Sequence, residues 1–256
     1  MATITAGRPA VEAVHLRPPG ELTAEREEWL VDGLVDALPG LRMRELFTLR
    51  RDMFRSADLI TVAVERASGA AVGVLCSRTE RLATGATLLN VTTQFVAEQM
   101  RHGFVFRAGW GAHFAALGHG GDPAGLPRLI ALKTYNPVVL CGMRAFTRIP
   151  GTSLYPDCRG GPQDPERMQT AERIAAVMAP GYPFDPKSGV ISGAGVPADL
   201  YPHRPLCRDA EINDHFARNT RPGDRVLCVF DVGTVEAAAA LLSAFRAGPA
   251  TPQEPR

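Results

Sequence analysis

The stretch from Thr87 to Arg148 constrains the fold most, because strand and helix patterns alternate along it without interruption. Its first strand, Thr87 to Val96, reads TLLNVTTQFV and is rich in β-branched and aromatic residues, as a buried strand should be. A short turn with Gly103 and an apolar, helix-like run to Leu117 follow. Since a second apolar strand, LPRLIALKT, covers Leu126 to Thr134 and leads into another helix, the stretch predicts a βαβα unit.

The turn between the first strand and the first helix combines Arg101 and His102 with Gly103. Where a strand runs into a helix, several backbone N–H groups without partners point at one spot, and the helix dipole adds a partial positive charge. Anions bind at such places. We therefore expect an anion site at this turn.

The second helix of the unit has a well-defined start. Pro137 suits the first helical turn, because its missing N–H is not needed there, and Asn136 before it is a good N-cap. The helix VVLCGMRAF then runs to about Phe146.

The chain before this unit predicts two helices and a hairpin. Thr23 can cap a helix that has an acidic first turn and ends at Pro39-Gly40, and a second amphipathic segment covers Leu41 to Arg55. Asp58 to Arg78 contains two β-branched runs joined by a short connection with glycine, which is typical of a hairpin. With the strand from Thr87, these runs predict an antiparallel meander.

The chain after the unit contains fewer regular elements. A helix is predicted from Pro165 to Met178, and a polar, proline-rich tract then extends to Asp209. Compact domains tolerate such length mainly for lids or binding loops. A short helix from Asp209 to Arg218, a buried strand from Arg225 to Gly233 and a helix capped by Thr234 complete the prediction.

The composition indicates a soluble protein with a small partner. The chain has 256 residues, of which 45% are hydrophobic and 21% charged. With 28 Lys and Arg against 27 Asp and Glu, its net charge is +1, so nothing global favours nucleic acid or an anionic membrane as a partner. No apolar run approaches the roughly 20 residues needed to cross a bilayer, and the start lacks a signal-peptide pattern. We therefore expect a cytoplasmic protein.

Several chemistries lack their sequence signatures. The five cysteines are scattered and form no Cys-x-x-Cys pair, so neither a disulfide framework nor a zinc site is indicated. The six histidines have no metal-binding spacing, and we expect no metal. A Gly-x-Ser-x-Gly elbow, a Walker loop and an intact Gly-x-Gly-x-x-Gly after a strand are absent. Serine hydrolysis, phosphoryl transfer and dinucleotide redox chemistry are therefore not favoured.

The order of elements resembles the GNAT (GCN5-related N-acetyltransferase) acyltransferases over roughly Ala24 to Arg148, with Arg225 to Gly233 as a return to the sheet. The string TYNPVVLCGMRAFTRIPGTSLYPD is similar to a branch of that superfamily with an extended C-terminal region. The resemblance implies an α/β (α+β) fold with a mixed, mainly antiparallel sheet flanked by helices. It also implies one domain, with a core of about 22–150, an extension of about 151–246 that completes the sheet and the acceptor side, and loose tails at 1–12 and 247–256.

The resemblance assigns residues to acyl-CoA. In that family the turn after the fourth strand holds the CoA pyrophosphate with backbone amides, and the N–H at the end of that strand, here Val96, polarises the thioester carbonyl. An Asn at the end of the fifth strand, here Asn136, contacts the CoA arm. The pyrophosphate turn corresponds to Arg101, His102, Gly103 and Phe104, or alternatively to the more glycine-rich stretch from Arg107 to Ala112.

Acyl transfer to an amine also needs a base and an acid. The resemblance implies a carboxylate near the central strands as base, for which we consider Glu98, with Glu65 as a weaker candidate. It implies a tyrosine beyond the fifth strand as acid, either Tyr135 or Tyr155. Each has a plain structural alternative, a solvated turn carboxylate or a packed tyrosine. Likewise His203 lines an acceptor pocket or is a surface histidine.

The sequence thus predicts an acyl-CoA-dependent N-acyltransferase (an acetyltransferase) that acts on an amine of a small molecule by direct transfer in a ternary complex. Acetyl-CoA or another acyl-CoA would be the co-substrate, and a homodimer is compatible with this prediction. Two alternatives stay open. One is a catalytically inactive GNAT-fold module for CoA binding or regulation, and the other is a transferase that uses a long-chain acyl-CoA or acyl-carrier-protein donor.

Overall fold

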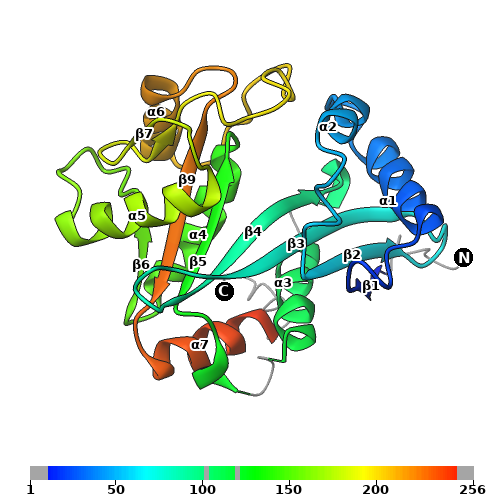
Figure 1. Cartoon of the computed structure of the whole chain (residues 1–256), viewed down its shortest axis with the longest axis horizontal. Coiled ribbons are helices and arrows are strands. Elements are labelled where there is room, and N and C mark those ends of the chain that lie inside the picture. Colours follow the sequence, from blue (N-terminus) through cyan, green and yellow to red (C-terminus); the bar gives the residue numbers. More distant parts are fainter. Residues whose placement is uncertain (1–10, 101–103, 119–121, 247–256) are drawn as a thin grey trace, which may run out of the picture.

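The computed structural model describes residues 11–100, 104–118 and 122–246, and one mixed sheet runs through this part of the chain (Figure 1). Its strands follow the order β1-β2-β3-β4-β5-β9-β8-β7, and β6 also pairs with β9. The strands are β1 Val11–Leu16, β2 Leu59–Glu65, β3 Ala71–Arg81, β4 Thr87–Val96, β5 Leu129–Thr134, β6 Thr152–Tyr155, β7 Phe184–Asp185, β8 Val190–Ile191 and β9 Arg225–Val232. The α-helices are α1 Ala24–Ala37, α2 Met43–Leu49, α3 Phe104–Ala116, α4 Pro137–Arg144, α5 Pro165–Met178, α6 Ala210–Asn219 and α7 Val235–Arg246.

Antiparallel pairs dominate the sheet. The predicted hairpin is confirmed, since β2 pairs antiparallel with β3, and Gly69 in the connecting turn has a φ of 70°, which favours glycine. β3 pairs in the same way with β4, which completes the predicted meander. Within the described residues only β4 and β5 pair parallel, and β9 then adds antiparallel to β5. The mixed, mainly antiparallel sheet predicted from the sequence is therefore confirmed.

The βαβα unit is formed by β4, α3, β5 and α4. Here β5 begins at Leu129 rather than at Leu126, because Pro127 has no N–H for the ladder and 123–125 form a 3-10 turn capped by Asp122. The start of α4 agrees with the prediction, since the Asn136 side chain accepts a hydrogen bond from the N–H of Val138 at 3.0 Å.

Other boundaries differ from the prediction. The segment from Leu41 to Arg55 is helical only over α2, because Met53 and Phe54 turn back into the core beneath α1 and α2. The strand β1 was not predicted, since it lies at the sheet edge with only Leu16 fully buried and lacks a clear alternation. The short strands β6, β7 and β8 were also missed, because two to four residues carry no measurable period.

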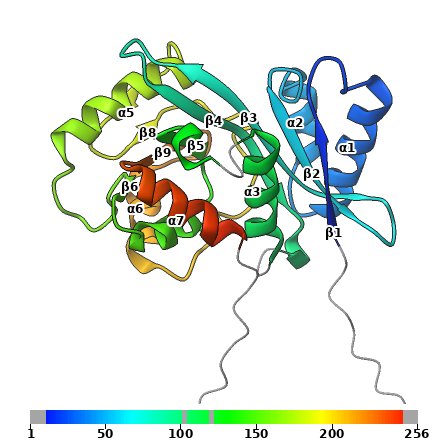
Figure 2. The same cartoon turned by 90° about the horizontal axis from the view of Figure 1, so that it is seen from below.

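Helices cover both faces of the sheet (Figure 2). On one face α3, α4 and α7 pack against a large apolar cluster that includes Leu89, Ile130 and Phe230. On the other face two separate clusters form. One lies between α1, α2 and strands β2 and β3, and the other lies between α5 and strands β5 and β9. No helix of the described residues is long and apolar enough to cross a membrane.

A buried hydrogen-bond chain joins α3 to the sheet. His113 is fully buried, with Nδ1 2.7 Å from Thr61 Oγ1 and Nε2 2.7 Å from Ser77 Oγ. Thr61 Oγ1 lies 3.1 Å from Nδ1 of His15 on β1. Hydroxyls both donate and accept, so neutral imidazoles satisfy the chain in one direction of donation. Burial, and then the neighbouring His15 and Arg17, lower the pKa of His113 to about 3.

Stability should therefore fall below neutral pH through His113. Above the unfolded pKa of about 6.5 the imidazole is neutral in both states, whereas below it only the unfolded chain takes up the proton. The free energy of unfolding of the wild type, measured relative to H113Q by urea denaturation, should thus decrease by about 2 kcal/mol between pH 6.5 and pH 5. The exposed His203, changed in H203Q, is the control and should show no such difference. An H113Q difference that stays constant with pH would contradict this account.

Candidate functional site

The strands β4 and β5 part in the middle of the sheet. Their parallel register runs from Leu88–Leu129 to Val91–Leu132, whereas β4 stays paired with β3 as far as Val96–Gly73. A bulge opposite Cys76 and Ser77 adds a residue to β4 and bends it. In the described part of the chain, the edge of β4 beyond Val91 therefore has no strand partner on the β5 side, and its backbone groups face an opening.

A cavity of about 540 Å³ occupies this opening. It is lined by the second half of β4, the end of β5, the first turns of α3 and α4, the end of α2 with the turn after it, and a part of the proline-rich tract around 194–201. The tract thus contributes to the wall of the site, as its length and composition suggested.

The cavity extends to both faces of the sheet. Phe106 of α3 together with Val139 and Gly142 of α4 lines it on the α3/α4 face. Arg50 after α2 and Met178 at the end of α5 line it on the opposite face. A ligand in this cavity would consequently pass between the parted strands.

The charged side chains of the lining are mostly cationic. Burial first, and then the neighbouring Arg50 and Arg225, lower the pKa of the Lys133 ammonium to about 8, and its Nζ donates to the carbonyl oxygen of Met178. Among the described residues, Asp52 is the single acidic one of the lining, and it is exposed. The cationic lining residues are Arg50, Arg78, Arg107, Lys133 and Arg225.

Arg225, the first residue of β9, is held against the tract. Its Nη1 donates to the carbonyl oxygen of Asp224 at 2.7 Å, and its Cζ lies 5.9 Å from the ring centroid of Tyr135. Burial lowers the pKa of this guanidinium. Gly195 leaves the space that it occupies, since a Cβ at 195 would lie 1.9 Å from Nη1 of Arg225.

Of the two tyrosines considered as acids, only Tyr135 lines the cavity. Its hydroxyl oxygen accepts a hydrogen bond from Nη2 of Arg204 at 2.9 Å, which leaves the hydroxyl proton free to be donated. Tyr155 instead is buried on β6, where its hydroxyl donates to the carbonyl oxygen of Pro186 at 2.7 Å and burial raises its pKa. The structure thus separates Tyr155 from the cavity.

The structure also locates most of the other predicted residues. Val96 and Asn136 line the cavity, whereas Glu98 lies exposed in a 3-10 turn after β4 and is not part of the lining. His203 is exposed and outside the lining as well. Phe104 is the first residue of α3. The residues Arg101, His102 and Gly103 lie outside the described part of the chain.

The alternative prediction for the position of the pyrophosphate turn is wrong. Arg107 to Ala112 lies entirely inside α3, so its backbone N–H groups are committed to helical hydrogen bonds and form no turn.

Three basic residues of the site were not predicted from the sequence. For Lys133 a signal existed, because a charged residue interrupts the otherwise apolar strand LIALKT. Arg50 and Arg225 carried no such signal, since each stands at the end of an element, where charge is ordinary. Among the described residues no group of His, Cys, Asp and Glu gathers that could hold a metal ion.

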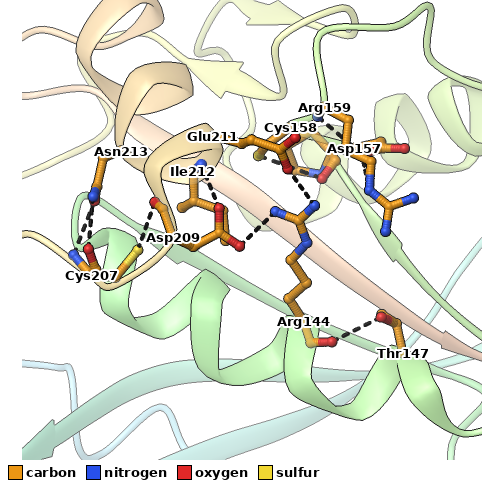
Figure 3. Close-up of polar contacts among 11 residues, drawn as sticks. Arg144, Thr147, Asp157, Cys158, Arg159, Cys207, Asp209, Glu211, Ile212 and Asn213 are labelled. Atoms are coloured by element: carbon orange, nitrogen blue, oxygen red, sulfur yellow. Dashed lines mark hydrogen bonds and ion pairs between the residues drawn. The ribbon is translucent and has the colours of Figure 1, made fainter.

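An ion-pair clamp holds α4 in place beside the cavity (Figure 3). Arg144 at the end of α4 donates from Nη1 to Asp209 Oδ2 at 2.8 Å and from Nη2 to Glu211 Oε2 at 2.7 Å. Asn213 holds the end of the tract by two hydrogen bonds to the backbone of Cys207, at 3.0 and 2.7 Å. The clamp thereby fixes α4 and the tract relative to α6.

No family model and no curated protein matches the sequence. Solved structures similar to this chain include diaminobutyrate acetyltransferase EctA from Paenibacillus lautus in complex with its substrate and coenzyme A, at 14% identity and a TM-score of 0.37 over 88% of this chain and 98% of that one. The GNAT-family N-acetyltransferase YhbS from Escherichia coli in complex with CoA is similar at 15% identity and a TM-score of 0.34, over 53% and 69% of the two chains. A GNAT-family acetyltransferase from Streptococcus pneumoniae is similar at 11% identity and a TM-score of 0.34, over 61% and 92%. These neighbours are N-acetyltransferases, and similarities this remote assign neither a substrate nor a site to this chain.

Proposed function

We propose that this protein is an acyl-CoA-dependent N-acyltransferase that transfers an acyl group, acetyl or longer, to an amine of a small molecule. The observation that carries this proposal is the parting of β4 from β5 over a cavity that extends to both faces of the sheet. The pantetheine arm of CoA is a narrow, extended chain with two amides. Such a chain can hydrogen-bond to an open strand edge in the way that an added strand does.

In this proposal the donor enters from the α3/α4 face. Phe106 and Val139 flank the arm there, and Asn136 lies where the arm passes the end of β5. The pyrophosphate is proposed to bind at Arg101, His102, Gly103 and Phe104, before and at the first residue of α3. The N–H at the end of β4, near Val96, would polarise the thioester carbonyl and stabilise the oxyanion that forms on attack.

The acceptor amine attacks this carbonyl, so that a C–N bond forms and the C–S bond breaks. Cationic neighbours such as Arg50 and Lys133 favour the neutral, nucleophilic form of a bound amine, because they lower its pKa. Tyr135 is the proposed acid for the leaving thiolate. Glu98 as acceptor of the amine proton stays a prediction, and its exposed position outside the lining would require water between the two groups.

Narrowing the donor side of the cavity should weaken CoA binding. Gly142 lines the cavity, and the nearest atom to a Cβ at this position would be Cζ of Phe106 at 3.6 Å, so a leucine would extend its remaining carbons into the space between α3 and α4. We expect G142L to raise the Kd of acetyl-CoA, measured by calorimetry, by at least about tenfold, or ~1.4 kcal/mol. G109L is the matched control, because Gly109 is also in a helix but outside this cavity and its Cβ would meet no atom within 4 Å. Equal affinity of G142L and the wild type for acetyl-CoA would show that the donor does not bind at this position.

The role of Tyr135 can be tested separately from binding. Removal of the hydroxyl in Y135F should lower kcat by about 10²-fold, as expected for loss of a general acid, and leave the Kd of acetyl-CoA unchanged. Release of free thiol from acetyl-CoA in the presence of an amine panel measures kcat. The buried Tyr155 lies outside the cavity, so that Y155F controls for loss of a tyrosine hydroxyl. Tight CoA binding by the wild type without any turnover would instead favour the inactive binding module.

A further inference from the structure

Three cations converge on the α2/α5 side of the cavity without a carboxylate partner. Arg50, Lys133 and Arg225 all line the cavity, and each is partly buried. Within the described residues, none of them takes part in an ion pair with Asp or Glu, and the hydrogen-bond partners found for Lys133 and Arg225 are backbone carbonyl oxygens. Arg50 lowers the pKa of both Lys133 and Arg225, and this effect is larger than the opposite one of Glu80 on Lys133 or of Asp224 on Arg225.

The other two cations of the lining differ in this respect. Arg78 donates to Glu80 Oε1 at 2.7 Å, so its charge is balanced inside the protein. Arg107 is exposed on α3, at the donor side. The uncompensated charge therefore belongs to the three residues Arg50, Lys133 and Arg225, which we call the cationic triad.

Like charges that are partly buried together repel one another and lose hydration, and such an arrangement is costly unless an anion joins it. Two guanidinium groups and an ammonium offer the donors that carboxylate and phosphate groups prefer. The walls beside the triad include the apolar Met53 and Met178 and the aromatic Tyr201, and the carboxylate Asp52 of the same lining is exposed. An anionic group of modest size fits this chemistry.

The triad lies on the face of the sheet opposite to α3. Lys133 and Arg225 share the sheet face of Ala131 and Leu227, which pack against α5, whereas α3 packs on the other face. Arg50 follows α2, which covers that same α5 face. The phosphates of a CoA bound between α3 and α4 would therefore not neutralise the triad.

We propose that the acceptor carries, besides its amine, an anionic group, a carboxylate or a phosphate, and that Arg50, Lys133 and Arg225 bind this group. The proposal rests on the proposed acyltransferase function and names the class of its acceptor. Binding of the anion orients the amine toward the parting of β4 and β5, where the thioester is proposed to lie.

The position of the Arg225 guanidinium depends on the absence of a side chain at Gly195. The guanidinium of Arg225 fills the space that a side chain at 195 would need, and the N–H of Gly195 is tied to the carbonyl oxygen of Gly223 at 2.7 Å. G195A would therefore displace the Arg225 guanidinium while every charge of the triad is kept. The variant separates the position of the charge from its presence.

The first test measures binding of inorganic phosphate and of acetate, by calorimetry, to protein saturated with CoA. We expect both anions, or one of them, to bind, and R50M, R225M and G195A each to weaken the binding at least tenfold. R81M is the control, because Arg81 is exposed on β3, outside the lining, and should leave the Kd unchanged. Phosphate favoured over acetate indicates a phosphorylated acceptor, and the reverse order indicates a carboxylate.

Selective labelling gives a second readout that needs no acceptor. The chain has only two lysines, Lys133 in the triad and the exposed Lys187, so trace acetic anhydride followed by peptide mass spectrometry compares them in one sample. The anion that binds should slow the acetylation of Lys133 relative to Lys187 at least fivefold in the wild type. The protection should be absent in R50M and R225M.

The outcomes separate this inference from the proposed function. Absence of anion binding, or equal binding in R225M, G195A and wild type, overturns the triad as an anion site even when CoA binds. Displacement of phosphate by CoA overturns it too, because the triad then serves the donor. If CoA fails to bind while phosphate still binds to the triad in the free protein, the acyltransferase function is rejected instead. The assignment of the anion to an acceptor is then rejected with it. Turnover rates give a further outcome. The inference is also overturned if butylamine is turned over as fast as 4-aminobutyrate and ethanolamine as fast as its phosphate ester.

Discussion

The bulge between β3 and β4 is the constraint on which the rest of the structure depends. Because Thr93 pairs with Cys76 while Val91 pairs with Ser77, Thr92 is an extra residue, and the strand changes the faces of its side chains there. Before the bulge Leu88 packs toward α5, and after it Phe95 packs toward α1 and α2. A single strand thus joins two half-sheets, following β5 in its first half and only β3 in its second. The cavity exists because no strand fills the space between them.

A sheet opened in this way needs connections across the gap. The apolar clusters on the α2/α5 face are separate, so packing alone does not join the halves there. The proline-rich tract supplies the connection. The N–H of Arg42, before α2, donates to the carbonyl oxygen of Leu200 at 3.3 Å, and its side chain pairs with Asp199. Earlier in the tract, the N–H of Gly193 donates to Asp224 Oδ1 at 2.9 Å, next to β9. The long irregular segment is therefore a strap across the cavity, tied to both half-sheets by polar contacts.

This architecture determines how much of the structure could be predicted from the sequence. The hairpin, the strand Thr87–Val96 and the capped starts of the helices at Thr23, Asn136 and Thr234 could be predicted, because local period and capping chemistry determine them. The site could be predicted only where it is local to the βαβα unit, as at Val96, Tyr135 and Asn136. Arg50 and Arg225 lie 175 positions apart, since 225 minus 50 is 175, and no pattern along the chain brings them together. Their meeting depends on β9 pairing beside β5, which is a tertiary event.

The cationic triad is compatible with the fold because of the opening between β4 and β5. Replacing a partly buried, unpaired charge by an apolar residue usually stabilises a fold, so Lys133 in an apolar strand costs stability at the centre of the sheet. That cost can be small only where water or a ligand reaches the charge, and the parting of β4 from β5 provides this access. Had the strands stayed paired to the end of β5, Lys133 and Arg225 would lie under α5 and the tract with no solvated space beside them. The same departure from regular pairing that opens the cavity proposed for the thioester therefore also makes room for the positive charge that is proposed to select the acceptor.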